Sequence, residues 1–315
     1  MHSFVNRIIN YFFQNRINGP LTQQTKLHEN EASDSVKRLD FFIKVLKEMI
    51  EHIEPNYINN LHWYTFGIKI AKKFLIQSIT LQTSFLVNVS YDGEPDENRI
   101  IDFSSMFILL RSLSETYAMY YHFFIRCKNI EENIIRFRLW ELDGYLSRQK
   151  RYRNLWSDAD PKLIEEDEYI QKIKDAVTGL SFFKNLEKKK QEYLLNNAAW
   201  RFTSESLSEK ESRKWNPPIA YLLKNTSMKE QWIENMYHEY STHTHSGFLS
   251  IVENEKATRN ERIQHEQMGI LLASFIICFM IDDLKKPYKG GKEYYESLSP
   301  QNRSVIESFL TEGKK

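Results

Sequence analysis

The sequence predicts an all-α fold, a single large helical bundle built around a buried central helix. Only 10 Gly and 8 Pro occur among the 315 residues, too few for the many tight turns of an all-β sandwich or barrel. Hydrophobic residues make up 41% of the chain and aromatic residues 14%, enough bulky side chain to offset chain entropy in a packed core. We expect an amphipathic N-terminal segment at 1–33, the bundle domain at 34–290, and a C-terminal helix and tail at 291–315.

The first half of the bundle domain shows helical spacing of its apolar residues. "DSVKRLDFFIKVLKEMIEHI", residues 34–53, repeats apolar side chains on one face and predicts a long helix. A second helix is predicted at 61–89. The stretch "NVSYDGEPDENR", residues 88–99, combines Gly, Pro and Asp and predicts a loop.

Residues 100–130 carry almost no charge and are apolar on most sides, the pattern of a helix enclosed by others, so we expect the central helix here. The following helix, 131–156, is expected to be basic on its outer face. Basic residues between aromatic ones can track a nucleic-acid backbone, but a solvated helix face is the interpretation we favour. The arginines of this face are Arg136, Arg138, Arg148, Arg151 and Arg153.

The second half of the chain predicts further helices. One or two peripheral helices are expected in the highly charged stretch 161–200, and the chain breaks at Pro217 and Pro218. Two more helices are predicted at 227–245 and 255–285. "GILLASFIICFMI", residues 269–281, is shorter than the roughly 20 residues that span a bilayer and is followed by charges, so we interpret it as a core helix.

Composition excludes several classes of function. A net charge of +1 provides no global field toward nucleic acid or an anionic membrane. Cys127 and Cys278 lie in apolar stretches without metal-like spacing, which predicts two buried thiols in a reducing, cytoplasmic environment. No phosphate-binding glycine loop or GxSxG motif occurs. We therefore expect no nucleotide or other cofactor, no bound metal and no membrane association.

The central helix contains polar residues that such an apolar helix should not bury alone. In "FILLRSLSETYAMYYHFF", Arg111, Glu115 and His122 share one stripe with Ser104 and Phe107. Because an isolated buried ion costs several kcal/mol even after relaxation, these charges must be paired. The stripe predicts either an interior polar pocket or a simple structural Arg–Glu pair.

The stretch "YHEYSTHTHSG", residues 237–247, is the expected counterpart of this stripe. If it is helical, Tyr237, Ser241 and His245 fall on one face, with Tyr240 beside them and Gly247 as a helix C-cap. His243 and His245 would then point to nearly opposite sides. A zinc site at His238, His243 and His245 is therefore not favoured.

Together these two stretches resemble a family of helical bacterial proteins of unknown function. Its pattern is R-S-x-x-E in one helix and Y-x-x-Y/L-S-x-x-x-H in another. The residues that match are Arg111, Ser112, Glu115, Tyr237, Tyr240, Ser241 and His245. The family's proline after the histidine is replaced here by Ser246. The resemblance spans about residues 100–249 and implies an all-α fold without an assigned activity.

A second pattern, "RNERIQH", places Arg259 six residues before His265. It resembles the R-x4-6-H motif of helical ribonucleases from toxin–antitoxin and phage-defence systems. The resemblance implies that Arg and His act on the RNA 2′-hydroxyl and scissile phosphate without a metal, across a homodimer. The same residues also fit the charged first turn of the helix that continues into "GILLASFIICFMI".

Two hypotheses for function follow. The first is a metal-independent ribonuclease of the toxin or phage-defence kind with RNA as partner, in which His245 or His265 is the general acid or base and Arg111 or Arg259 neutralises phosphorane charge. The second is a non-catalytic helical binding or sensor module whose Arg–Glu–His network fixes helix register. His245→Ala should abolish activity with stability nearly kept in the first case, and should lower stability sharply in the second.

Overall fold

The structure is a computed structural model of the chain. It describes the backbone of residues 21–53, 62–86, 103–126, 129–152, 161–230, 237, 240–244 and 248–314, and the side chains of all these except 21–34, 62–63, 86, 248–249, 253–254 and 259. Within these ranges the chain is helical, and the only β-type pairing is an isolated bridge between Met228 and Lys314. The predicted all-α helical bundle is confirmed.

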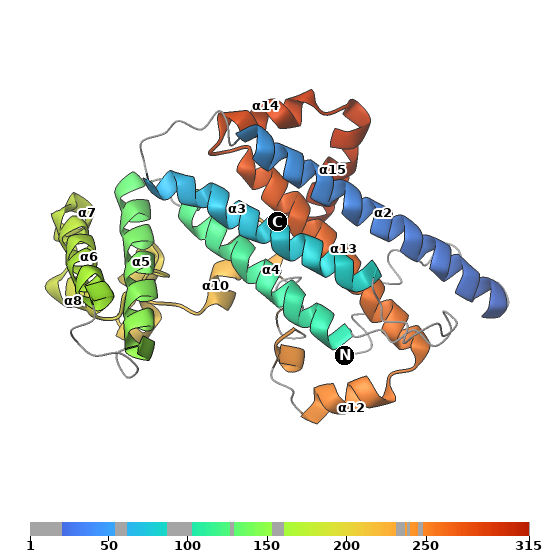
Figure 1. Ribbon diagram of the computed structural model, residues 1–315, viewed down its shortest axis with the longest axis horizontal. Coiled ribbons are helices and arrows are strands. Elements are labelled where there is room, and N and C mark those ends of the chain that lie inside the picture. The colour runs from blue at the N-terminus through green and yellow to red at the C-terminus, as the bar shows by residue number, and fades with distance from the viewer. Residues whose placement is uncertain are drawn as a thin grey trace.

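Four long helices form the bundle: α2 (Leu21–Ile53), α3 (His62–Leu86), α4 (Phe103–Phe124) and α13 (Arg259–Leu284). α13 packs against α2 and α4, and α3 packs against both α2 and α4 (Figure 1). Each of these helices buries apolar side chains in one continuous core. The helix predicted at 61–89 is therefore confirmed as α3, whereas α2 begins well before the predicted residue 34.

α4 and α13 are the most enclosed elements. Phe107, Leu110, Leu113 and Tyr117 of α4 are fully or almost fully buried. Every residue of α13 from Leu272 to Leu284 is buried. α13 is long and apolar enough to span a membrane by length and composition, but 83% of its most apolar window is buried inside the bundle. The expected central helix and core helix are both present, and Cys278 is a buried thiol as predicted.

The remaining helices surround this bundle. α14 (Lys289–Ser297) packs against α2, and α15 (Pro300–Gly313) packs against α13. α10 (Ile219–Lys224) and α12 (Phe248–Lys256) contact α4, and α9 (Ser204–Ser208) is a short capped helix. α12 falls between the two helices predicted at 227–245 and 255–285 and was not expected from the sequence.

An arm of helices extends from one end of the bundle (Figure 1). It consists of α5 (Ile130–Tyr152), α6 (Pro161–Gly179), α7 (Ser181–Lys184) and α8 (Lys188–Asn196). The stretch 161–200 thus forms three helices rather than one or two. The loop predicted at 88–99 lies outside the described residues, as do Cys127 and Arg153.

One prediction for α5 is wrong. Arg136 was expected on a basic outer face, but its side chain is buried, with 1% relative exposure. Its guanidinium pairs with the buried Glu132, and it donates to the carbonyl oxygens of Phe202 at 3.1 Å and His122 at 3.3 Å. Because the segment around Phe202 and the end of α4 cover this side of α5, the face that carries Arg136 is interior. Arg138 and Arg148 pair with Glu141 and Glu166, as expected of a solvated face.

Candidate functional site: a polar seam on the central helix

Tyr237 and residues 240–244, which we call segment 237–244, pack along the polar stripe of α4. Residues 237 and 240–244 are helical. Along the segment, Tyr237 contacts Arg111 and Glu115, Tyr240 contacts Phe107, and His243 contacts Phe107 and Ser104. The residue numbers fall on one partner as they rise on the other, so the two elements run antiparallel. We call the polar contacts of this pair, Ser104–His243 and Arg111–Glu115–Tyr237, the polar seam.

Arg111, Glu115 and Tyr237 form a closed triangle of hydrogen bonds. Arg111 Nε donates to Glu115 Oε1 at 2.9 Å, Arg111 Nη2 donates to the Tyr237 hydroxyl at 3.2 Å, and that hydroxyl donates to the same Glu115 oxygen at 3.2 Å. The guanidinium carbon also lies 5.1 Å from the centre of the Tyr237 ring, a cation–π distance. The sequence-predicted Arg–Glu pair is therefore present, and its third partner is a tyrosine of the opposing segment.

The triangle is only partly shielded from solvent. The side chain of Arg111 is 20% exposed and that of Glu115 is 32% exposed. The hydrogen bond to Glu115 raises the pKa of Arg111, while burial and then the charge of Glu115 raise the pKa of Tyr237. Both groups therefore keep their protons at neutral pH, and the positive charge of Arg111 is already balanced by Glu115.

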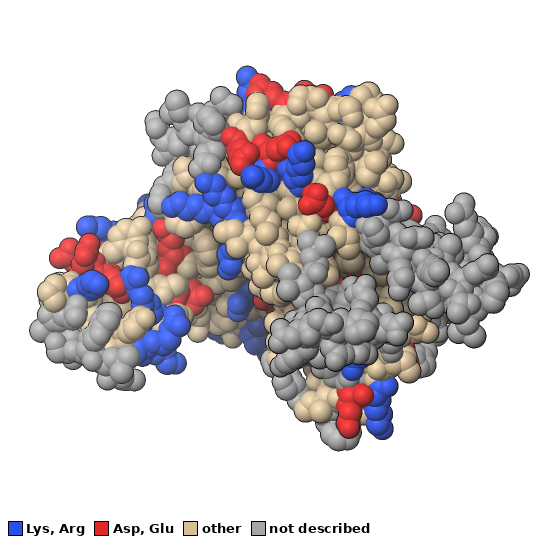
Figure 2. All heavy atoms as spheres, turned by 45° about the vertical axis from the view of Figure 1, so that its right-hand side comes forward, with Lys and Arg blue, Asp and Glu red and all other residues tan. Residues whose placement is uncertain are grey.

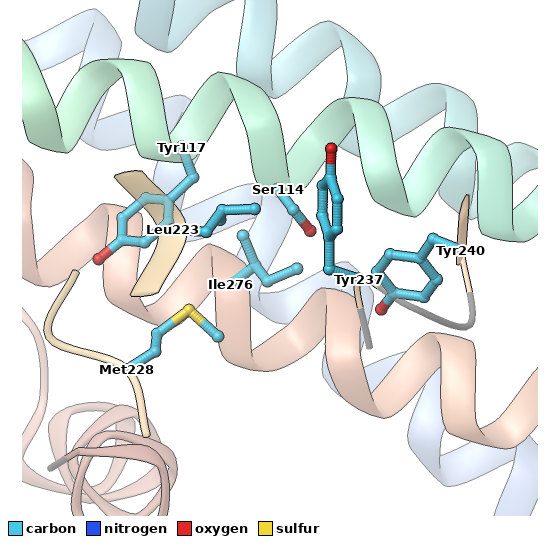
Figure 3. A pocket seen from close by; sticks show the side chains of 7 residues that line it. All are labelled: Ser114, Tyr117, Leu223, Met228, Tyr237, Tyr240 and Ile276. Atoms are coloured by element: carbon cyan, nitrogen blue, oxygen red, sulfur yellow. The ribbon is translucent and has the colours of Figure 1, made fainter. Parts of the chain in front are cut away.

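A small cavity lies beside the triangle. Its lining includes Ser114 and Tyr117 of α4, Met228, and the rings of Tyr237 and Tyr240. Figure 3 shows the hydroxyl of Tyr237 pointing toward α4, so that its ring rather than its polar atom faces the cavity. The space is about 10 Å³, enough for the centre of one water molecule. No substrate of ordinary size fits there.

A second cluster lies at the other end of the seam. His243 Nδ1 is 3.1 Å from Ser104 Oγ, and the imidazole is 3% exposed. Its ring packs on Phe103 and Phe107 at centroid distances of 5.4 and 5.1 Å. His265 of α13 stacks on Phe103 at 4.7 Å, and the Arg262 guanidinium lies 5.7 Å from the same ring. Two imidazoles and one guanidinium thus surround one phenylalanine.

The remaining predicted site residues lie as follows. Tyr240 is buried, whereas Ser241 is half-buried and its side chain makes no hydrogen bond to any other described residue. Ser112 accepts from Gln77 Nε2 at 2.8 Å, which ties α3 to α4. Arg259 is the first residue of α13 and follows the N-cap Thr258. It therefore lies in a charged first turn, as the second interpretation of "RNERIQH" predicted. Its side chain is outside the described set. His238, His245 and Gly247 also lie outside it.

His122 does not reach the triangle, although it shares the same stripe of α4. Its Nε2 is 3.2 Å from the carbonyl oxygen of Trp200, and the ring is buried. Burial, and then the nearby charge of Arg136, lowers its pKa well below the usual value. The imidazole is therefore neutral at physiological pH, and Nε2 is the donor to the carbonyl. His122 anchors the segment after α8 to α4.

Three residues of this region, His243, Ser104 and Arg262, were not predicted as functional residues. His243 lies six residues after Tyr237, and with Tyr240 it completes a face spaced i, i+3, i+6. That spacing was visible, but only the partner helix shows that this face, and not the one with Ser241, meets α4. Among the described residues no group of three or more His, Cys, Asp or Glu side chains is placed to hold a metal ion.

Comparison with known proteins adds no relative: no family model, no curated protein and no solved structure matches this chain.

Proposed function

We propose that this protein is a non-catalytic helical binding or sensor module, in which the polar seam fixes how segment 237–244 packs on α4. The observation that carries the proposal is the closed triangle of Arg111, Glu115 and Tyr237. Each member is the hydrogen-bond partner of the other two, and the acidic member balances the basic one. Such a network specifies one packing register, because a shifted segment would leave these polar groups without partners.

The electrostatics of the triangle argue against a role in phosphoryl chemistry. An arginine that stabilises a phosphorane must direct donors at the developing charge. Two of the three guanidinium nitrogens of Arg111 are engaged by Glu115 and Tyr237 instead, and Glu115 already balances the charge of Arg111. The third nitrogen, Nη1, is buried and has no hydrogen-bond partner among the described residues. The adjoining cavity of about 10 Å³ offers no room for a nucleotide. These two facts support the binding or sensor module over the ribonuclease.

A specific observation nevertheless keeps the ribonuclease as a second candidate. His243 and His265 both pack on Phe103 and Phe107, and Arg262 lies over Phe103. Two imidazoles with a guanidinium are the groups that cleave RNA without a metal, one imidazole as base and one as acid. This candidate would take RNA as substrate, and the R-x4-6-H resemblance would make a homodimer its active form.

The experiment that separates the two candidates is cleavage of labelled total RNA in the presence of EDTA. The wild type is tested beside His243→Ala, His245→Ala and His265→Ala, with a melting temperature recorded for each. His52→Ala is the matched control, because His52 is an exposed histidine at the end of α2. The module proposal predicts no cleavage by the wild type and a lowered melting temperature for His243→Ala, whose ring is buried.

RNA cleavage that survives EDTA, that remains in His52→Ala, and that is lost in a His265→Ala or His245→Ala variant with an unchanged melting temperature would establish the ribonuclease. It would also identify which histidine acts in the reaction.

A further inference from the structure

The arm carries a groove that is much larger than the cavity beside the Arg111–Glu115–Tyr237 triangle. It lies between α5 and α6, has a volume of about 280 Å³, and is lined by Arg138, Tyr169, Lys172, Ile173 and Ala176. We propose that this groove binds a small phosphate monoester. The proposal rests on the groove alone and is independent of the function assigned to the seam.

In the groove, the carboxylate of Glu141 lies deeper than the guanidinium of Arg138 that it binds. Arg138 Nη1 donates to Glu141 Oε2 at 2.7 Å, and the Tyr169 hydroxyl donates to Glu141 Oε1 at 3.4 Å. The side chain of Glu141 is only 9% exposed, whereas that of Arg138 is 28% exposed. Glu141 thus orients the two donors from beneath. A guanidinium has five N–H donors, so Arg138 keeps donors for a ligand.

Lys172 supplies the second cation. Its side chain is exposed on α6, and no carboxylate of a described residue lies within ion-pair distance of its ammonium. Arg138, Glu141 and Lys172 together carry a net charge of +1. A lysine without such an ion pair gains more from a bound anion than a paired one, since it gives up no existing interaction.

The chemistry of a phosphate monoester fits these groups. A monoester carries about −1.5 to −2 charges at pH 7 and presents three acceptor oxygens. Arginine recognises phosphate with paired N–H groups, and lysine recognises it as a point charge. The groove is slightly smaller than the roughly 300–1,000 Å³ typical of sites for drug-sized ligands, so the ester must be small.

The rest of the groove provides a surface for the organic part of the ester. Ile173 and Ala176 are apolar, and the Tyr169 ring is held against Tyr145 at a centroid distance of 5.0 Å. Figure 2 shows basic and acidic side chains mixed on the part of the surface that it displays. With a net charge of +1 for the whole chain, recognition of an anion must come from such a local arrangement rather than from a general field.

Binding is measured with phenyl phosphate and with inorganic phosphate, following the phosphorus NMR signal of each probe against full-length protein at low salt. The variants are Lys172→Ala, which removes the second cation, and Ala176→Glu, which adds a negative charge at an exposed lining position. Lys174→Ala is the matched control, because it removes one charge from α6 outside the groove. Melting temperatures establish that every variant is folded.

We expect phenyl phosphate to bind at millimolar concentration and more tightly than inorganic phosphate. Lys172→Ala and Ala176→Glu should each weaken binding about fivefold or more, Lys174→Ala should not, and added salt should weaken binding further. The proposal is overturned if the wild type binds neither probe, if Lys174→Ala loses as much affinity as Lys172→Ala, or if both probes bind equally well.

Discussion

At the residue scale, a buried ion pair on α5 links distant parts of the chain. Arg136 and Glu132 are four residues apart on α5, and both are almost completely buried. Around them, Ser204 Oγ donates to Glu132 Oε2 at 3.1 Å, and two backbone carbonyls accept from Arg136. Because Ser204 and Phe202 lie in the segment after α8 and His122 lies at the end of α4, this ion pair joins the arm to the bundle.

Glu132→Ala should destabilise the protein by about 3–5 kcal/mol, because it leaves the Arg136 guanidinium buried without its counter-charge. The control is Glu51→Ala, since Glu51 forms a solvent-exposed pair with Lys47 on α2 and its loss should cost within about 0.5 kcal/mol. Urea unfolding measures both free energies. Similar losses for the two variants would show that the buried pair contributes no more than a surface pair.

The sequence allowed the pairing of Arg111 with Glu115 to be predicted, because both lie on one helix and their spacing is fixed. It did not reveal that Arg136 is buried. The spacing of Glu132 and Arg136 is the same as that of Arg111 and Glu115, but the segment that covers Arg136, around Phe202, is more than 60 residues away in the sequence. Spacing within a helix determines which residues share a face, and distant segments determine whether that face is covered.

At the scale of elements, Gly67 allows the connection before α14 to approach α3 closely. A Cβ at Gly67 of α3 would overlap the Tyr288 hydroxyl. That hydroxyl donates to the carbonyl oxygen of Tyr64 at 2.9 Å, and the Tyr64 hydroxyl donates to the carbonyl of Pro287 at 2.9 Å. The start of α3 is therefore locked to the connection between α13 and α14 through this contact.

Gly67→Ala should lower stability by about 1–3 kcal/mol, since the added methyl group forces Tyr288 out of its hydrogen bond. Gly144→Ala is the control, because Gly144 lies inside α5 and nothing is within 4 Å of the position that an alanine methyl group would take. Through helix propensity alone, this alanine should raise stability by up to about 1 kcal/mol. Thermal unfolding of the two variants should therefore shift in opposite directions. A stabilised Gly67→Ala would contradict the close packing.

The identity of the long helices was predictable because their apolar period extends over many residues, as in α3, α4 and α13. The short helices were harder. α12 has nine residues, and α7 has four, and at such lengths the period repeats too few times to be distinguished from a loop. Their positions depend on packing against α4 and α5, which the sequence of each short helix does not encode by itself.

At the scale of the whole molecule, many tyrosine side chains are partly or fully buried. Burial is the main cause of a raised pKa at seven tyrosines, and it raises the pKa of Tyr295 to about 12. Tyr117 donates to Asp283 at 2.8 Å, whereas the Tyr120 hydroxyl is buried and has no hydrogen-bond partner among the described residues. The tyrosines with raised pKa are Tyr64, Tyr117, Tyr120, Tyr169, Tyr237, Tyr294 and Tyr295.

Stability should fall steeply as pH rises above about 10, the ordinary pKa of tyrosine. Above that pH the unfolded chain releases phenolic protons that the folded chain still holds, so the unfolded state binds fewer protons and the free energy of unfolding decreases with pH. Below it these groups make no pH-dependent contribution. Circular dichroism in urea at a series of pH values measures the slope.

Tyr120→Phe tests the origin of that slope. The substitution removes a buried hydroxyl that no other described residue hydrogen-bonds, so stability at neutral pH should be unchanged or slightly higher. The loss of stability in alkali should be shallower than in the wild type. An unchanged alkaline slope would mean that Tyr120 ionises as readily in the folded chain as in the unfolded one.

The most direct test of the polar seam is a double-mutant cycle with Glu115→Ala and Tyr237→Phe, with unfolding free energies measured for the wild type, both single variants and the double variant. If the Tyr237 hydroxyl binds Glu115 and thereby holds segment 237–244 on α4, the coupling energy should be about 0.5–3 kcal/mol. A coupling energy near zero would contradict the seam as the contact that fixes this segment.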